Sequence, residues 1–343
     1  MKSDRRSLRI VADDKIPYLQ GQAERMGTVS YLPGAAISQA DVADADVLIV
    51  RTRTRCDRAL LEGSRVRFVA TATIGYDHID TGYLAEAGIA WANCPGCNAS
   101  SVGQYVATSL LRLAEAGYVR LDACCVGIVG VGHVGTAVDR AVQALGCQTL
   151  LCDPPRAAAE GPEGFASMDE VYDRADVITY HVPLVRDGRW PTVHMADFQR
   201  MKRRPVLINA ARGEVVDNMA LLAALDSGQV RAAVVDTWEG EPAISLPLLR
   251  RVFIGTPHIA GYSADGKAAG TRMALEAVAR HFGFDIRFDI QPPALPASIV
   301  PAADPLVRML QLYDPLADTA RLKSEPGRFE YLRGHYPLRR EHF

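Results

Sequence analysis

The sequence has no long apolar run and no excess of positive charge. No uninterrupted apolar segment reaches the roughly 18 residues that a membrane-spanning helix needs, and the N-terminus lacks the apolar core of a secretory signal. The formal net charge is −2 over 343 residues, so the chain has no basic field that would attract nucleic acid or an anionic membrane. We therefore expect a cytoplasmic protein with neither nucleic acid nor a membrane as a partner.

Cysteine is scarce, and its spacing indicates neither a metal site nor a disulfide framework. The chain has seven cysteines, and in a reducing compartment most of them are expected to be small buried side chains. Cys94 and Cys97 form a C-x-x-C pair, but no thioredoxin-like helix pattern follows them, so we interpret the pair as a turn. No metal ion is expected.

The chain does contain two series of short apolar runs that alternate with amphipathic segments. The first series is LRIVAD, VLIVRT, RFVATA and GIAWAN, and the later one includes QTLLCD, DVITYHVPL, PVLINAARG, RAAVVDTWEG and VFIGTPHIAGY. A length of 343 residues also exceeds what one core normally supports. These features predict an α/β protein with two Rossmann-like or flavodoxin-like doubly wound parallel-sheet domains and a cleft between them.

A glycine-rich turn follows the apolar run that ends at residue 129. Gly130, Gly132 and Gly135 fit the pattern G-x-G-x-x-G, which permits a tight turn, a close approach of backbone N–H groups to a pyrophosphate, and close packing of the next helix. The following apolar run ends on Asp153, 18 residues after Gly135, where a carboxylate can accept hydrogen bonds from a ribose. Because a 2′-phosphate would meet this negative charge, the spacing favours NAD as the cofactor.

The fingerprint divides the chain into three parts. We expect a substrate-binding domain at residues 1–97, completed by residues 262–283, and an NAD-binding domain at residues 98–261. Residues 98–116 and 264–282 have apolar positions at helical spacing, so they predict two helices that connect these domains. Residues 284–343 begin with a proline-rich stretch and then carry two short helical patterns, LVRMLQLYD and RFEYLRGHY.

Three polar residues stand where predicted strands of the second series end. They are Arg212 in NAARGEVVDN, Glu241 in DTWEGEP and His258 in TPHIAGY. Each could be an ordinary loop residue, but together, downstream of a dinucleotide fingerprint, they suit hydride transfer from an alcohol. We expect His258 to be the general base, Glu241 to orient its ring, and Arg212 to hold a substrate carboxylate and polarise the reacting oxygen.

These residues also carry a resemblance to known proteins. The motifs GVGHVG, HVPL, INAARG, DTWEGEP and TPHIAGY occur in this order and resemble the D-2-hydroxyacid dehydrogenase superfamily. Within it, the segments VRTRT, FVATATIGYDHID, CPGCNASSVGQYV, LLCDPPRA, HIAGYSADGKAAGT and YPLRREHF resemble the erythronate-4-phosphate dehydrogenase family. Its members oxidise 4-phospho-D-erythronate in pyridoxal phosphate synthesis. The resemblance runs from about Leu8 to the last residue.

The resemblance implies roles for individual residues and a homodimer built through the C-terminal domain. It implies that the catalytic residues are Arg212, Glu241 and His258. It implies cofactor contacts at Gly130, Gly132, His133, Val134, Gly135, Asp153, Val182, Ala210, Ala211, Arg212, Asp236 and Gly261. It implies substrate contacts at Thr52, Thr73 and Tyr262.

Two departures from the family pattern affect these expectations. Val182 stands in HVPL where members of the family often have threonine, which removes one side-chain hydrogen bond near the cofactor. The C-terminal domain, residues 284–343, is expected to be shorter than the family's, which puts its ability to dimerise in question.

The phosphate of the expected substrate needs charge-assisted donors, and arginine is the strongest side-chain choice. Candidates near the first domain are Arg51 and Arg53, which flank Thr52 at the end of the run VLIV. Arg339 and Arg340 are the other candidates, and we expect a dimer to deliver them across the interface into the partner's cleft.

Two alternative functions share most of these features. The first is a sister D-2-hydroxyacid dehydrogenase that acts on another acid such as 3-phosphoglycerate, since the wider superfamily shares the three polar residues. The second is a non-catalytic NAD(H)-sensing binding protein, because the same fold also serves transcriptional corepressors. Turnover of a phosphorylated hydroxy acid distinguishes an enzyme from a sensing protein, and an assay with 4-phosphoerythronate and 3-phosphoglycerate side by side distinguishes the two enzymes.

Overall fold

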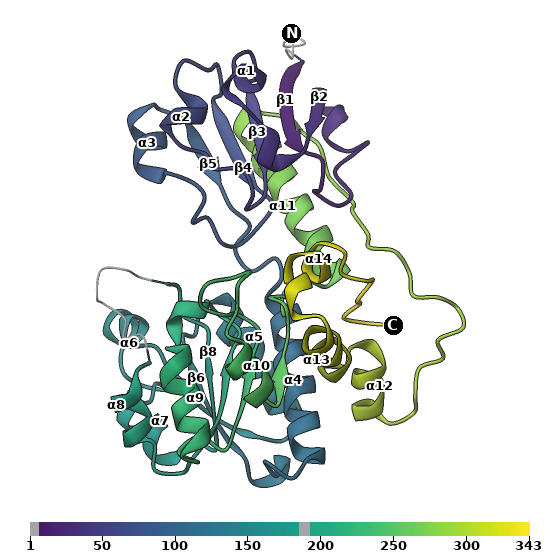
Figure 1. Ribbon diagram of the computed structural model, residues 1–343. Helices are drawn as coiled ribbons and strands as arrows, with labels where there is room; N and C mark the ends of the chain where they lie inside the picture. The colour runs from purple at the N-terminus through teal and green to yellow at the C-terminus, as the bar shows by residue number, and fades with distance from the viewer. Residues whose placement is uncertain (1–6, 185–192) are drawn as a thin grey trace. The chain divides into compact units, whose positions relative to one another are not determined.

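The computed structural model describes residues 7–184 and 193–343, and the chain divides into two compact units (Figure 1). Unit 1 consists of Met1–Asn98 and Ala264–Ala294, and unit 2 consists of Ala99–Ser263 and Leu295–Phe343. Within the described ranges, no helix is long and apolar enough to cross a membrane.

Unit 1 is built on a five-stranded parallel sheet with the strand order β2-β1-β3-β4-β5. Its strands are β1 Leu8–Asp13, β2 Gly27–Leu32, β3 Val47–Val50, β4 Phe68–Thr71 and β5 Ala90–Ala92. Its α-helices are α1 Gln39–Val42, α2 Arg58–Leu61, α3 Thr81–Glu86 and α11 Ala264–Phe282. Two 3-10 helices, η1 Ala23–Arg25 and η2 Gly34–Ala36, complete it.

Successive residues of the unit 1 strands pack on opposite faces of the sheet. In β3, Val47 and Ile49 join the core beneath α11, whereas Leu48 and Val50 join the core beneath α1, α2 and α3. Both faces are covered by helices, which explains why the central strands β3 and β4 are buried along their whole length.

Unit 2 is built on a six-stranded parallel sheet with the order β11-β10-β9-β8-β6-β7. Its strands are β6 Cys125–Val129, β7 Gln148–Cys152, β8 Val177–Tyr180, β9 Val206–Asn209, β10 Ala232–Val235 and β11 Ile254–Gly255. From β6 the chain continues to β7 on one side and then to β8 on the other, so the strand order reverses at β6. In open α/β sheets, ligands bind at the carboxyl ends of the strands next to such a reversal.

Helices cover both faces of this second sheet as well. The helices that precede the last strand are α4 Ala99–Glu115, α5 His133–Ala144, α6 Pro154–Glu160, α7 Met168–Arg174, α8 Met195–Arg200, α9 Asn218–Asp226 and α10 Leu246–Arg251. The 3-10 helices are η3 Leu121–Ala123 and η4 Gly213–Val215. Side chains of α4 and α5 share one core with alternate residues of β9, and those of α7 to α10 share the other.

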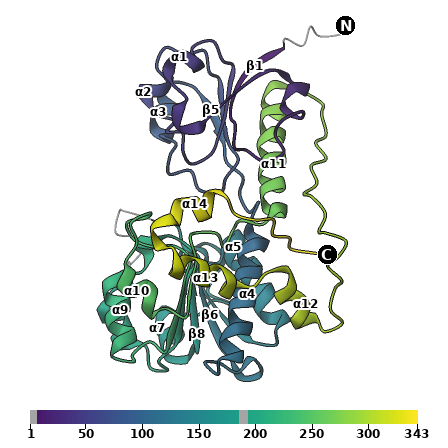
Figure 2. The same ribbon diagram turned by 45° about the vertical axis from the view of Figure 1, so that its right-hand side comes forward.

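The C-terminal segment, residues 295–343, packs within unit 2 (Figure 2). It forms α12 Pro305–Leu312, α13 Pro315–Ser324, η5 Pro326–Arg328 and α14 Phe329–Gly334. Helix α13 lies along the edge strand β11, where Thr319 Oγ1 accepts a hydrogen bond from Gly255 N at 3.2 Å. Leu322 and Phe329 are fully buried in the core beneath α7 to α10, so the segment is an integral part of this unit's core.

The two parallel sheets confirm the predicted fold class, and the differences from the expected elements are local. Strand β2 was not expected, because its partly exposed sequence GTVSYL has little of the apolar run that marks the other strands. Helix α13 was also missed, because its sequence PLADTARLKS is largely polar and only one stripe of it is buried. Cys94 and Cys97 form a turn, as predicted, with Cys97 N donating to Cys94 O at 3.2 Å, and burial raises the pKa of Cys97 to about 12.

Candidate active site

The glycine-rich turn joins β6 to α5 at the strand reversal of unit 2. Gly130 has a φ of +89°, and a Cβ there would lie 2.8 Å from the carbonyl of His181 at the end of β8. A Cβ on Gly135 would lie 2.0 Å from Gly130 O, so both positions require glycine for close backbone packing. Around Gly132, by contrast, a Cβ would meet no heavy atom within 4 Å among the described residues.

The open space at Gly132 fits the phosphates of a dinucleotide. Gly132 is the N-cap of α5 and offers no side chain to the first N–H groups of that helix, which begins with His133 and Val134. Uncapped N–H groups and the positive end of the helix dipole favour an anion at this point. Val182, 6% exposed, borders the same turn with its Cγ1 2.8 Å from the Cβ position of Gly130.

Asp153 ends β7 and stabilises the glycine-rich turn. Its Oδ2 accepts a hydrogen bond from Val131 N at 2.8 Å, and its Oδ1 accepts one from Arg156 N at 3.1 Å at the start of α6. The Arg156 guanidinium pairs with Glu160 at 2.7 Å and donates to Val131 O at 2.6 Å. Arg156 is therefore held by other acceptors and does not pair with the Asp153 side chain.

Arg212, Glu241 and His258 follow β9, β10 and β11, which are neighbours in the sheet. Because the carboxyl ends of parallel strands meet at one edge, the topology brings all three residues to the same edge. The loop after β9 packs directly on the loop after β10, since a Cβ on Gly213 would lie 2.0 Å from Trp238 O.

His258 and Glu241 form a hydrogen-bonded pair. His258 Nδ1 lies 2.8 Å from Glu241 Oε2, with side chains 27% and 18% exposed. Burial disfavours the charged form of Glu241, but hydrogen bonds from His258 and from Trp238 N, together with the charge of Arg333, outweigh it and lower its pKa. Glu241 is therefore ionised at neutral pH and accepts the proton of His258 Nδ1, which leaves Nε2 as the basic nitrogen of the neutral ring.

Asp236 holds the loop that carries His258. Its carboxylate is 1% exposed and accepts hydrogen bonds from Thr256 Oγ1 at 2.6 Å, Ile259 N at 2.8 Å and Ala260 N at 2.9 Å. Burial raises the pKa of Asp236, although these donors favour its charged form. His258 has a φ of +57°, an uncommon backbone conformation that these bonds and the bond from His258 N to Asp236 O stabilise.

Arg212 is the N-cap of η4, and its loop is held by the buried side-chain amide of Asn209. Asn209 Nδ2 donates to Arg212 O at 2.9 Å, and Asn209 Oδ1 accepts from Ala211 N at 3.2 Å. Arg212 Nη1 donates to Ala211 O at 2.8 Å. Ala210 and Ala211 lie at the end of β9, and Gly261 lies in the loop after His258, so these predicted cofactor residues share one edge of the sheet with the three polar residues.

The predicted substrate residues lie in both units. Thr52 follows β3 and Thr73 follows β4, with Thr73 Oγ1 2.7 Å from Thr71 Oγ1 and donating to Gly75 O at 2.9 Å. Arg51 Nη1 donates to Lys15 O at 2.9 Å. Tyr262 belongs to unit 2, where its hydroxyl accepts a hydrogen bond from Arg333 Nε at 2.9 Å.

The sequence predicts that Arg339 reaches the partner's cleft, but the structure places its side chain in the core of its own chain. It is 3% exposed, and its guanidinium donates to Gln104 Oε1 at 2.8 Å, Ile259 O at 3.2 Å and Ser101 O at 2.6 Å in its own chain. Its guanidinium carbon also lies 3.7 Å from the centre of the Tyr313 ring. Arg339 is therefore committed to the core of unit 2 and is not retained as a phosphate ligand.

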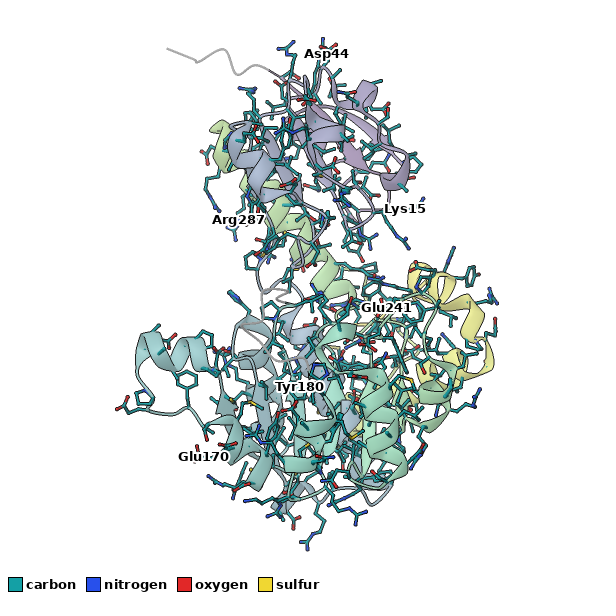
Figure 3. The ribbon with its side chains drawn as sticks, turned by 60° about the vertical axis from the view of Figure 1, so that its left-hand side comes forward. Lys15, Asp44, Glu170, Tyr180, Glu241 and Arg287 are labelled. Atoms are coloured by element: carbon teal, nitrogen blue, oxygen red, sulfur yellow. The ribbon has the colours of Figure 1, made fainter. Side chains whose placement is uncertain are left out.

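Arg333, which was not predicted from the sequence, is brought by α14 to the side of Glu241. Its Nη1 lies 4.0 Å from Glu241 Oε2, the same oxygen that His258 contacts. Figure 3 shows Glu241 beside the yellow C-terminal segment. No strand or motif marks Arg333 in the sequence, because its position depends on how residues 295–343 fold back on unit 2.

Comparison with known proteins identifies the family. Residues 104–260 match the NAD binding domain of the D-isomer specific 2-hydroxyacid dehydrogenases. An erythronate-4-phosphate dehydrogenase of Bacteroides thetaiotaomicron is 49% identical over 338 residues, which cover 97% of each chain. The chain belongs to the erythronate-4-phosphate dehydrogenase family. It is thus an NAD-dependent oxidoreductase, as the motifs predicted.

A second relative supports this placement, and a solved structure shows the same fold. The Escherichia coli erythronate-4-phosphate dehydrogenase is 45% identical over 97% of this chain and 92% of its own. The NAD⁺-bound 3-phosphoglycerate dehydrogenase of Entamoeba histolytica shares the fold, with a TM-score of 0.68 and 20% identity over 81% of this chain and 96% of its own.

Proposed function

We propose that the chain oxidises 4-phospho-D-erythronate at C2 to the corresponding 2-oxo acid, in pyridoxal phosphate synthesis, with the catalytic residues Arg212, Glu241 and His258. The observation that carries this assignment is the 2.8 Å contact between His258 and Glu241 on the sheet edge where the loop of Arg212 also ends. Near-full-length identity of 49% to an erythronate-4-phosphate dehydrogenase supports 4-phospho-D-erythronate as the substrate.

His258 acts as the general base in this proposal. Its Nε2 accepts the proton of the C2 hydroxyl while the hydride leaves C2, and NAD supplies the acceptor for that hydride. The positive charge that forms on the ring faces ionised Glu241 across the Nδ1 hydrogen bond. Glu241 thus stabilises the protonated ring and holds its orientation.

The remaining roles follow from charge and position. Arg212 offers a planar fork for the substrate carboxylate and polarises the C2 oxygen. Thr52, Thr73 and Tyr262 are proposed as further substrate contacts, and Arg51 and Arg340 stay candidates for the phosphate. We also propose that the enzyme is a cytoplasmic homodimer that uses its C-terminal segment to dimerise.

Glu241→Gln is expected to move the acidic limb of the kcat/KM profile for oxidation to lower pH. Without the carboxylate, the positive charge that forms on the His258 ring during the reaction loses the counter-charge that lies 2.8 Å from Nδ1. The plateau rate should fall by about tenfold or more, because the developing imidazolium is no longer stabilised. NAD affinity should change little, and an unchanged pH profile would leave Glu241 as a structural residue only.

Asp153→Asn is expected to narrow the preference for NAD over NADP by about tenfold or more. The substitution removes the charge that repels a 2′-phosphate, while the amide oxygen can still accept from Val131 N or Arg156 N. Asp153→Ala should also weaken NAD itself, because it removes both bonds that hold the turn. The measurement is kcat/KM with each cofactor, and an unmodified enzyme that uses NADP equally well would contradict this role.

The decisive assay compares 4-phospho-D-erythronate with 3-phosphoglycerate at equal concentrations of purified protein. We expect NADH formation with the first substrate and at most slow turnover with the second. A preference for 3-phosphoglycerate would indicate a sister dehydrogenase. Tight NADH binding without turnover of either acid would indicate a sensing protein.

A further inference from the structure

We propose that Arg333 of α14 binds the phosphate of the substrate, within the same chain. This inference rests on the proposed function and deepens it, because it assigns the group that distinguishes this substrate from simpler 2-hydroxy acids. The residue comes from the C-terminal segment, whose contribution to the site would then be a cation and not only a dimer contact.

The first observation is that the Arg333 guanidinium is mostly buried with few of its donors used. Its side chain is 20% exposed. A guanidinium has five N–H donors, and among the described residues only Nε makes a hydrogen bond, to Tyr262 Oη at 2.9 Å. Burying a charged group with so many unmatched donors is unfavourable unless an acceptor joins it.

The second observation is that no carboxylate in the described part of the chain pairs closely with Arg333. Glu241 Oε2 and Glu330 Oε1 each lie 4.0 Å from its Nη1, beyond hydrogen-bonding distance. Glu241 is already bonded to His258 and to Trp238 N, and the Glu330 side chain is 36% exposed to screening solvent. The Nη edge of Arg333 therefore stays open to an anionic ligand.

The position of Arg333 relative to the reacting carbon suits a phosphate on C4. Arg333 Nη1 lies 4.0 Å and His258 Nδ1 lies 2.8 Å from the same oxygen, Glu241 Oε2, so both side chains flank one carboxylate. In an extended substrate, bonds of about 1.5 Å place the phosphorus about 5 Å from C2. A hydroxyl at His258 and a phosphate at Arg333 are thus compatible with one short substrate.

The chemistry of the ligand also favours arginine over the other candidates. A phosphomonoester dianion forms two parallel charge-assisted bonds with a guanidinium fork. Arg339 has no such edge available, because three acceptors take its donors. Tyr262, fixed beside Arg333 by the bond at 2.9 Å, would lie next to the bound phosphate.

The test measures kinetics of the full-length enzyme with 4-phospho-D-erythronate and with unphosphorylated D-erythronate. Arg333→Gln should raise KM for the phosphorylated substrate by about 10- to 100-fold, the usual effect of losing one or two charge-assisted bonds. The KM for D-erythronate should change much less, since that substrate has no phosphate to lose, whereas any effect of the lost charge on Glu241 should change kcat for both substrates alike. Arg333→Lys, which keeps the charge but not the fork, should give an intermediate KM.

The control is Arg328→Gln, which removes an exposed arginine that precedes the same helix and pairs with Glu325. It should leave both substrates unchanged, and NAD affinity should be normal in all three variants as a check on folding. Equal rises in KM with both substrates, or a shifted pH profile at constant KM, would overturn the proposal and make Arg333 a positioning residue for Glu241. Failure of the unmodified enzyme to oxidise 4-phospho-D-erythronate would reject the proposed function instead.

Discussion

His258→Ala is expected to lower kcat for oxidation of 4-phospho-D-erythronate by about 10²- to 10⁴-fold. The substitution removes the nitrogen base that is hydrogen-bonded to ionised Glu241. Water could still accept the proton, but without a fixed position or a stabilised positive charge. NAD binding should persist, because the loop itself is held by Ile259 N and Ala260 N on the Asp236 carboxylate.

The matched variant is His258→Asn. Residue 258 has a φ of +57°, which asparagine tolerates better than alanine, so this variant separates loss of the base from backbone strain. We expect a comparable loss of kcat in both variants, measured as initial rates of NADH formation, with NAD affinity measured by protein fluorescence. Turnover within about tenfold of the unmodified enzyme in the asparagine variant would assign the base to another residue.

Arg339→Ala is expected to destabilise unit 2 by about 3 kcal/mol or more, and to do so without a specific effect on substrate binding. The change removes the Arg339 donor from Ser101 O, Gln104 Oε1 and Ile259 O, of which Ile259 O keeps its hydrogen bond from Tyr262 N at 2.9 Å. Each unsatisfied buried acceptor costs roughly 1–3 kcal/mol, and the emptied space beside Tyr313 adds to the loss.

The measurement is the midpoint of urea unfolding together with KM of the folded enzyme. Arg328→Ala serves as the control, because that side chain is half exposed and its removal should change the free energy of unfolding by less than about 0.5 kcal/mol. A large rise in KM for the phosphorylated substrate with unchanged stability would restore the original expectation that Arg339 reaches a phosphate.

Much of the fold follows from local pattern. The apolar run LRIVAD predicts a strand and forms β1 at Leu8–Asp13, and the helical spacing of residues 264–282 predicts α11 over Ala264–Phe282. Both elements bury a continuous apolar surface, so the spacing of apolar residues within each segment is enough to predict it. Strand β2 and helix α13 bury only part of their surface, and their polar residues obscure the period.

The residues of the candidate site were likewise predicted only in part from the sequence. Motif spacing placed Arg212, Glu241 and His258 at strand ends, and the sheet order makes those strands neighbours. Sequence alone did not reveal Arg333 or the three carbonyl and amide acceptors of Arg339, because these contacts join residues more than 70 positions apart.

The sequence by itself determined the two parallel α/β sheets, the dinucleotide fingerprint and the family. These depend on short-range pattern: apolar runs, glycines at fixed spacing and motifs in order. Only the tertiary structure decided what the arginines of the C-terminal segment do. In the sequence, nothing distinguishes Arg333, in a polar helix, from Arg339, in a loop. In the structure, Arg333 Nη1 lies 4.0 Å from Glu241 Oε2, whereas Arg339 is buried against α4. The difference comes from the packing of Leu322 and Phe329 into the core of unit 2, which sets where each guanidinium finds its partners.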